Sequence, residues 1–328
     1  AYAKESGLHE RSYLFGLVNV KAEYKLTNDI TLTGMSYWQG GTWNEKTFQN
    51  EAYFYDYWNP DRLRKFWSPN YLNQARNVDS EWYVRGMAEY NKEIGEHTFQ
   101  LMLGYEQTSH EWNGMSGGRE DFYNNELQEI NVGDPNRDWV NGNSYEWRLR
   151  SGFGRIRYDY KDRYLLEVNG RYDGSSRFAR GRRFGFFPSV SLGWRISQEE
   201  FMSNLDFINE FKLRASWGKT GNQSIVIGGS EQYYPYWQVI TLGHSYVLGD
   251  QLVNGAAQTQ LANKEISWET TTTTGIGLDL ELFNRRLRFV GDVYKKITDG
   301  ILLNLPIMAI VGLDPAVQNA GKLQNTGW

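Results

Sequence analysis

Apolar and polar residues alternate with a period of two along most of the chain. From Phe184 to Ile196 every second residue is apolar, and most of the residues between them are glycine, serine or arginine. Because successive side chains of a β-strand point to opposite faces, this pattern predicts a strand with one apolar face and one small or polar face. Similar alternation predicts ten strands, at residues 10–26, 30–39, 80–92, 97–108, 144–160, 163–173, 184–196, 210–217, 268–283 and 286–297.

Two segments depart from simple alternation. Within 144–160 the apolar positions change phase after Phe153, which predicts a β-bulge near Gly154. Residues 197–209 carry Ser197 and Glu200 ahead of several apolar residues, the spacing of a capping box, and so predict a short capped helix.

The connections between the predicted strands alternate between short and long. Residues 25–29, 93–96, 161–162 and 284–285 are tight turns, whereas 40–79, 109–143, 174–183 and 218–267 are long. Such alternation puts all tight turns at one end of the sheet, as in a transmembrane β-barrel with short periplasmic turns and long extracellular loops. We therefore expect the apolar faces to contact lipid and the polar faces to line a wet lumen. Rings near strand ends would form the aromatic girdles: Tyr24, Trp38, Tyr90, Tyr105, Tyr172, Trp194, Trp217 and Trp268.

Composition narrows the classes of protein that fit. The chain has 328 residues, a formal charge of −4 and no cysteine, which gives no electrostatic case for nucleic acid and excludes disulfides and thiolate metal sites. Aromatic residues make up 16%, while the mean hydropathy is only −0.64, which favours rings at interfaces over a large aliphatic core. The alternative is a soluble, extracytoplasmic, aromatic-rich β-sandwich or propeller that binds carbohydrate and uses these rings as its core.

Catalytic and metal-binding patterns are weak. The four histidines are scattered, with no metal-ligand spacing and no nucleophile motif, so we expect neither an enzyme nor a cofactor. Asp134, Asn136 and Asp138 have the spacing of the first ligands of a calcium-binding loop. Pro135 interrupts this motif, so a polar turn is the favoured interpretation. A basic run at 177–183 could meet anionic substrate or lipopolysaccharide phosphates, although a role in packing the loop is favoured.

The long loops that hold many rings are the better candidates for a binding site. Rings with polar edges suit stacking on sugars, and the predicted contacts are Trp58, Trp67, Tyr55, Tyr236 and Trp237. Trp58 and Trp67 each stand two residues before a proline, which restricts the local backbone. The alternatives are that these rings pack the loops together or contact a partner protein.

Several long motifs carry a family resemblance. They are "YLLEVNGRYDGSSRF" (164–178), "FGFFPSVSLGWRISQEEFM" (184–202), "FKLRASWGKTGNQ" (211–223), "ISWETTTTTGIGLDLELFNRRL" (266–287) and "QNAGKLQNTGW" (318–328). With these stretches the chain resembles the SusC/RagA family of TonB-dependent outer-membrane transporters of the Bacteroidota. The first 143 residues agree with the family in their pattern of strands and loops, but this pattern is less diagnostic than the motifs.

The resemblance implies part of a 22-stranded, plugged, all-β barrel in the cell outer membrane, with 1–328 belonging to the barrel domain. It implies import of oligosaccharides or, less favoured, peptides, together with a SusD-like surface lipoprotein and the TonB complex. The sequence opens at Ala1 with polar residues and reaches Trp328 within a new strand pattern. We therefore expect an internal segment of a longer polypeptide, with the plug and the final strands in other parts of that polypeptide.

Overall fold

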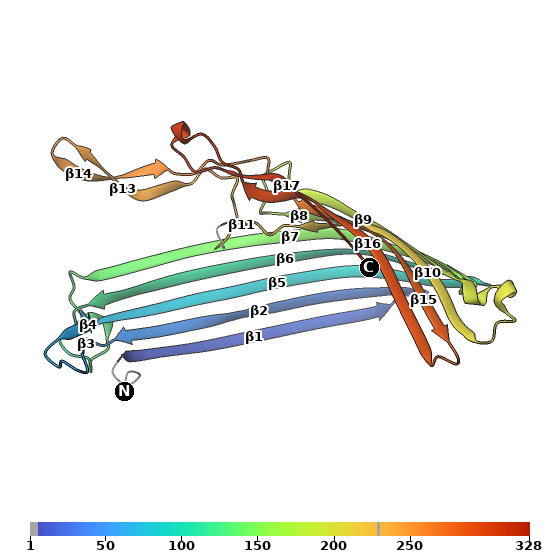
Figure 1. Ribbon diagram of the computed structural model, residues 1–328, viewed down its shortest axis with the longest axis horizontal. Helices are drawn as coiled ribbons and strands as arrows, with labels where there is room; N and C mark the ends of the chain where they lie inside the picture. Colours follow the sequence, from blue (N-terminus) through green and yellow to red (C-terminus); the bar gives the residue numbers. More distant parts are fainter. Residues whose placement is uncertain (1–5, 228–229) are drawn as a thin grey trace. The chain divides into compact units, whose positions relative to one another are not determined.

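A computed structural model describes residues 6–227 and 230–328. Eleven strands are hydrogen-bonded in the order β1-β2-β5-β6-β7-β8-β9-β10-β15-β16-β17 (Figure 1). Their bounds are β1 Gly7–Lys25, β2 Ile30–Gln49, β5 Tyr71–Ile94, β6 His97–Glu120, β7 Asp138–Tyr160, β8 Tyr164–Ser175, β9 Phe184–Arg195, β10 Ile208–Asn222, β15 Glu269–Leu282, β16 Leu287–Asn304 and β17 Val317–Gly327. All ten predicted strands and the further one before Trp328 are confirmed.

Three hairpins stand outside this sheet. They are β3 Ala52–Tyr55 with β4 Leu63–Trp67, β11 Val226–Ile227 with β12 Ser230–Glu231, and β13 Ile240–Leu248 with β14 Gln251–Gln258. Short 3-10 turns complete the described structure, at Ile130–Val132, Ile196–Gln198, Glu200–Met202 and Ala309–Val311. No helix in residues 6–227 or 230–328 has the length and apolar character to cross a membrane.

The chain divides into two compact units, which we describe separately. The first unit comprises residues 6–20, 36–83 and 109–146, and the second comprises 21–35, 84–108 and 147–328. The tight turns after β1, β5, β7 and β15 all belong to the second unit. The turns after β7 and β15 use left-handed backbone at non-glycine positions, Lys161–Asp162 and Phe283–Arg285.

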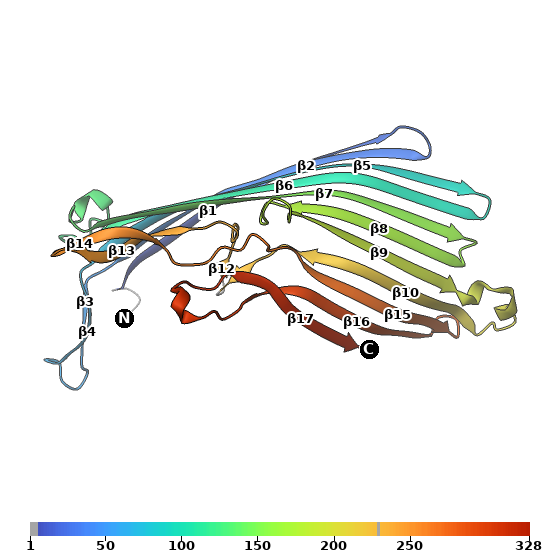
Figure 2. The same ribbon diagram turned by 90° about the horizontal axis from the view of Figure 1, so that it is seen from above.

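Antiparallel pairing in the second unit builds one continuous apolar row across five strands. Leu166 pairs with Leu192, Leu192 with Ala215, Ala215 with Ile276, and Ile276 with Val293. The neighbouring row, on the other face, is Glu167, Ser191, Ser216, Gly275 and Tyr294. Leu192 is 54% exposed and Ile276 65%, so this face leaves large apolar side chains uncovered. An exposed apolar face of this extent indicates contact with lipid or protein. Figure 2 shows β8, β9, β10, β15 and β16 side by side.

The polar face of the second unit carries a buried apolar cluster at one end. It consists of Phe178, Phe187, Ile225, Ile266, Trp268 and Val317. The indole nitrogen of Trp268 donates to the carbonyl of Arg183 at 2.9 Å. Trp268 is thus a core residue, and its predicted place in a girdle is wrong. Other girdle candidates, among them Tyr24, Tyr105, Tyr172 and Trp217, are exposed as expected.

The same cluster explains the change of phase in β7. The ladder between β7 and β8 runs without a shift from Leu149 to Tyr160, so no bulge interrupts it at Gly154. Leu149 instead packs against the buried cluster on the polar face. Apolar residues therefore move to the other face at this level because the cluster needs them there, and the predicted bulge is wrong.

The long strands exceed the predicted lengths. β5 and β6 have 24 residues each, and the segments 40–49, 71–79, 109–120 and 138–143, expected to be loop, are strand. Backbone pairing continues where the apolar face ends, which alternation of hydrophobicity cannot reveal. At about 3.3 Å per residue, 24 residues extend about 80 Å, well beyond an apolar band of about 25 Å.

The segment after β9 forms two 3-10 turns in place of the predicted helix. Neither has a side-chain cap, so Ser197 and Glu200 make no capping box. Ile196, expected on the lipid side, is buried. Glu199, between the two turns, has extended backbone (φ −80°, ψ 148°), which interrupts the helical run.

Candidate functional site

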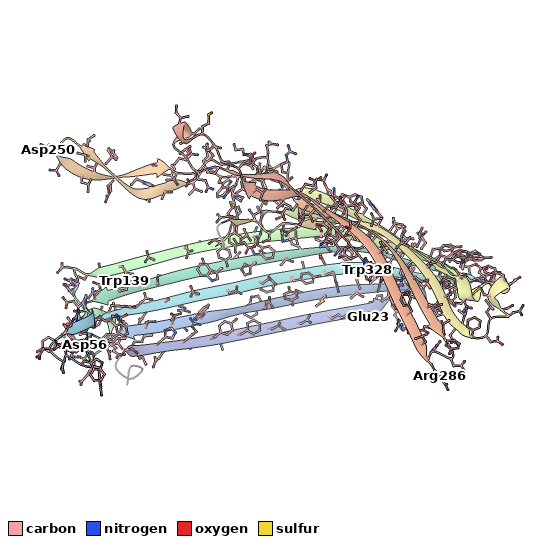
Figure 3. The ribbon with its side chains drawn as sticks, viewed as in Figure 1. Glu23, Asp56, Trp139, Asp250, Arg286 and Trp328 are labelled. Carbon is pink, nitrogen blue, oxygen red and sulfur yellow. The ribbon has the colours of Figure 1, made fainter. Side chains whose placement is uncertain are left out.

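The β3–β4 hairpin of the first unit presents the predicted contacts Tyr55, Trp58 and Trp67. Trp58 lies in the turn between β3 and β4, where Figure 3 labels Asp56, and is 88% exposed. The amide of Trp58 donates to Asp56 Oδ1 at 2.9 Å, and its ring meets Tyr57 edge-on at 5.0 Å. Tyr55 is also exposed, whereas Trp67 is half-buried and pairs with Ala52 in the ladder. The hairpin thus offers the exposed rings of Tyr55, Tyr57 and Trp58 to an incoming ligand and holds Trp67 at its base.

Hydrogen bonds fix the base of this hairpin. Glu51 accepts hydrogen bonds from Tyr53 Oη at 2.6 Å and Ser68 Oγ at 2.8 Å. The Tyr53 and Ser68 hydroxyls lower the pKa of the Glu51 carboxyl. Nearby, the buried Asn70 accepts from the amide of Phe122 at 2.7 Å, which joins the hairpin to a core of Phe48, Leu72 and Phe122.

The other two predicted contacts lie in the loop between β12 and β13 of the second unit. Tyr236 is only 8% exposed, and its hydroxyl donates to the carbonyl of Ser176 at 3.3 Å. Trp237 is exposed and stacks on Tyr234 with ring centroids 5.1 Å apart. Tyr236 therefore anchors the loop, while Trp237 presents ring surface to solvent.

The basic run at 177–183 holds the loops of the second unit together. Arg177, 4% exposed, pairs with Glu231, and its guanidinium lies 4.8 Å from the Tyr233 ring and 5.3 Å from the Trp147 ring. Arg182 pairs with Glu265. Arg183 Nε donates to the carbonyl of Phe178 at 3.1 Å. Three of the four arginines thus bind partners within the protein, which agrees with the favoured interpretation of loop packing.

A cluster of rings and carboxylates in the first unit was not predicted. The Tyr37 hydroxyl donates to Glu81 Oε1 at 2.7 Å, and Gln39 Nε2 donates to the same oxygen at 3.0 Å. His110 Nδ1 lies 3.8 Å from Glu81 Oε2, and its Nε2 lies 3.6 Å from Asp79 Oδ2. We name this group, with the three rings described next, the ring–carboxylate cluster.

Further rings extend the cluster on either side. Tyr37 stacks on Tyr83 with centroids 4.9 Å apart, while Tyr145 stacks on His110 at 5.9 Å and on Trp112 at 5.2 Å. Within the described chain, neither Glu81 nor Asp79 pairs with a lysine or arginine, so the cluster carries negative charge. The residues come from β2, β5, β6 and β7. Their period-two spacing was visible in the sequence, but the pairing that gathers them was not.

On its polar face the second unit carries ion pairs. Arg214 binds Asp279 at 2.8 Å and Asp292 at 3.1 Å, and Arg195 binds both oxygens of Glu210 at 2.9 Å. A hollow of about 660 Å³ is lined by charged side chains that include Arg157, Glu167 and Lys212. A wet lumen wall is expected to carry such a face.

Two smaller features complete the polar chemistry. Asp134 Oδ1 accepts from the amide of Asn136 at 2.9 Å, the geometry of an Asx turn, as the polar-turn interpretation expected. In the part of the chain that the structure describes, no group of three or more His, Asp or Glu could hold a metal ion. In the 3-10 segment, hydrogen bonds from Tyr164 Oη and then Trp194 Nε1 lower the pKa of Glu199.

Comparisons with known proteins agree on one family. The model of the TonB dependent receptor-like β-barrel family matches residues 9–328. The chain is 35% identical to TonB-dependent receptor P3 of Formosa agariphila over 77% of its length, and 32% identical to TonB-dependent receptor SusC of Bacteroides thetaiotaomicron over 80%. These matches cover 24% and 25% of the relatives, so the chain spans about a quarter of their length.

Among solved structures, the chain is similar to one described as the RagAB peptide transporter. The TM-score is 0.83 at 23% identity, with 99% of this chain and 34% of that chain covered. At this identity the likeness concerns the fold alone.

Proposed function

The chain belongs to the TonB-dependent receptor β-barrel family, and on that premise we propose that it forms part of the wall of an importer of neutral oligosaccharides. It is a segment of an outer-membrane protein with an all-β, antiparallel barrel fold, as the SusC/RagA resemblance predicted. This membership overturns the alternative of a soluble sandwich or propeller. The substrate, the partners and the residues of the site are proposals.

The ring–carboxylate cluster is the observation that carries the choice of substrate. Aromatic rings bind the apolar faces of sugars, and carboxylate oxygens accept hydrogen bonds from their hydroxyls. Glu81 and Asp79 have no lysine or arginine partner among the described residues, so a uronic or sulfated sugar would be repelled. We assign this face of the first unit to the lumen wall and a neutral sugar to the cluster.

The exposed rings would serve the capture of the sugar. Trp58 at the tip of the β3–β4 hairpin and Trp237 in the second unit both present ring surface to solvent. Tyr55 and Trp67 would support Trp58, and Tyr236 would position Trp237. Each exposed ring is expected to contribute about 1–3 kcal/mol to binding, as truncated interface aromatics do.

The proposal extends to the rest of the transporter. We expect a SusD-like lipoprotein to cover the extracellular mouth, and the TonB complex to act through parts outside this chain. Peptides are the second candidate substrate, because the similar solved structure is described as a peptide transporter. The negative cluster would then hold a cationic peptide group, and the two substrates are separable by experiment.

The test measures the binding of saccharides to the full transporter in detergent by calorimetry. Neutral oligosaccharides should bind, uronic oligosaccharides should not, and Trp58→Ala or Glu81→Gln should weaken binding about tenfold. Tyr123→Ala, another highly exposed ring of the first unit, is the control and should bind as the wild type does. Preference for uronic sugars, or unchanged affinity in both variants, would contradict the proposal.

A further inference from the structure

The apolar face of the second unit contains a groove with a floor of glycine. Across β7, β8 and β9, Gly152 pairs with Tyr172 and Tyr172 with Phe186, while in the next row Gly154 pairs with Gly170. Figure 2 shows these three strands as neighbours. A Cβ at Gly152 would meet no atom within 4 Å, so missing side chains leave open space there.

Large apolar side chains form the walls of this groove. Leu103, Ile156, Tyr172 and Phe186 line a hollow of about 800 Å³ together with the three glycines. Leu103, Ile156, Tyr172 and Phe186 are all exposed, and they belong to the face that we assign to the membrane. A hollow of this size exceeds what one side chain of a neighbouring protein would fill, and its lining suits hydrocarbon.

Arginine stands above the groove on the same face, at Arg150 and, two residues further from the groove, at Arg148. Arg150 is the residue two positions before Gly152 on β7, about 7 Å along the strand. It pairs with Gly174, which pairs with Phe184, and its guanidinium lies 5.0 Å from the centroid of the Phe184 ring. Because Gly174 has no side chain, the Phe184 ring lies across it, and Phe184 in turn stacks on Tyr172 at 5.0 Å.

This arrangement holds a positive charge at the rim of an apolar hollow. Arg150 is exposed, and among the described residues no carboxylate pairs with it. A guanidinium stacked on a ring keeps its donors directed outward, and its planar fork matches phosphate. By contrast, Arg177 pairs with Glu231 and Arg182 pairs with Glu265. These two arginines of the basic run at 177–183 therefore bind carboxylates of the protein and not a phosphate.

We propose that this groove binds one phosphorylated, acylated glycolipid of the outer leaflet, with its phosphate on Arg150 and an acyl chain along Gly152, Gly154 and Gly170. The positive charge of Arg150 is complementary to the phosphate of such an amphiphile, and the apolar groove is complementary to its acyl chain. The aromatic pair Tyr172 and Phe184 lies between them, at the level where rings favour the membrane interface. The inference rests on the proposed function in one respect, the assignment of the apolar face to the membrane and of the long loops to the outside.

The experiment uses the full transporter, purified and delipidated in detergent, with monophosphorylated lipid A as the probe. Native mass spectrometry measures the fraction of protein that retains the lipid. Arg150→Gln should weaken retention about tenfold, as expected for the loss of one charge-assisted hydrogen bond. Gly152→Leu should weaken it as well, because the new side chain enters the open space of the groove.

Matched control variants separate this site from general effects. Arg286→Gln removes the same charge at the turn between β15 and β16 (Figure 3), and Gly34→Leu fills open space elsewhere on the sheet. Both should retain the lipid as the wild type does. Because saccharide binding is measured on the same variants, a failure of the lipid site is distinguishable from a failure of the proposed transport function.

Three results would overturn the proposal. One is wild-type retention in Arg150→Gln, and another is equal retention of dephosphorylated lipid A, which would leave only unspecific acyl contact. The third is release of the lipid by millimolar inorganic phosphate alone, since that would make the site one for free phosphate. Should Gly152→Leu fail to fold, Arg150→Gln on the exposed surface still decides the outcome.

Discussion

Arginine placed on the apolar face should cost stability according to its depth in the membrane. On β9, Trp194 and Phe184 mark the two ends of the apolar face, ten residues apart. At about 3.3 Å per residue and a tilt of about 40°, this distance spans about 25 Å along the membrane normal, the height of a lipid-facing band. Ile156 lies near the middle of the band, because it pairs with Val168 and Val168 pairs with Val190.

Ile156, 48% exposed, is therefore the position for the test. Ile156→Arg should lower the free energy of unfolding by about 2–4 kcal/mol, the cost of arginine near the midplane of a barrel. Leu192 lies two residues from Trp194 on β9, about 5 Å inside the band. Leu192→Arg should therefore lower the free energy of unfolding by only about 1 kcal/mol. Ser191→Arg, on the polar face beside Leu192, is the matched control and should be milder still.

The assay is guanidinium unfolding of the full transporter in lipid vesicles, followed by tryptophan fluorescence. From most to least destabilising, we expect the order Ile156→Arg, Leu192→Arg, Ser191→Arg. A cost for Ile156→Arg below that of Ser191→Arg would refute the assignment of the two faces. Equal costs for Ile156→Arg and Leu192→Arg would refute the depths derived from the register.

Three other predictions concern the ends of the strands. Cysteine at Asn284, in a tight turn, should resist an impermeant reagent added to whole cells, while cysteine at Asp250, at the tip of the β13–β14 hairpin, should react; the reverse pattern would invert the orientation. The pKa of Glu199 is lowered by folding from an ordinary value of 4.5, so its contribution is complete above that pH and is lost as the pH falls further. A comparison of melting temperatures should accordingly show a smaller acid-dependent loss below pH 4.5 in Glu199→Gln than in the wild type, and equal losses would contradict the role of its hydrogen bonds. Arg177→Gln should cost about 1–3 kcal/mol, since it leaves Glu231 without its cation, and should speed proteolysis of the loop that follows β12; unchanged cleavage would show that the pair does not order this loop.

The sequence predicted the strands well because a membrane-facing strand must alternate. Leu166, Leu192 and Ile276 were each assigned to the correct face from their neighbours alone, and the register places them in one row. Strand ends were missed where β5 and β6 continue with mostly polar residues. There the apolar residues, such as the buried Leu72, are too few to alternate, so the pattern gives no means of finding the boundary.

Residues with two compatible environments were harder to place. Trp268 suits both a membrane girdle and a buried core, and only its contacts with Phe178 and Phe187 decide between them. Phe187 stands on the polar face of β9, which made it an exception in the sequence and a core residue in the structure. The capping box at Ser197 failed for a different reason: Glu199 has extended backbone, which interrupts the helical run, and its carboxylate accepts hydrogen bonds from Tyr164 and Trp194.

Some features of the candidate site could also be predicted from the sequence, and others could not. The exposure of Trp58 and Trp237 could be predicted from the sequence because loops rich in rings stand out, although Tyr236 in the same loop is buried, and their contact with substrate stays a prediction. The ring–carboxylate cluster could not be found, because Tyr37, Glu81 and His110 are far apart in sequence and meet only through strand pairing. No local motif marks such a group.

The central claim is import of neutral oligosaccharides, and uptake by whole cells tests it most directly. Cells with the intact gene and cells with the gene deleted would be given a labelled neutral oligosaccharide or a labelled peptide of similar size, with and without a protonophore. The account predicts that oligosaccharide uptake requires the gene and stops with the protonophore, while peptide uptake is unchanged by the deletion. Loss of peptide uptake on deletion, with oligosaccharide uptake intact, would contradict it.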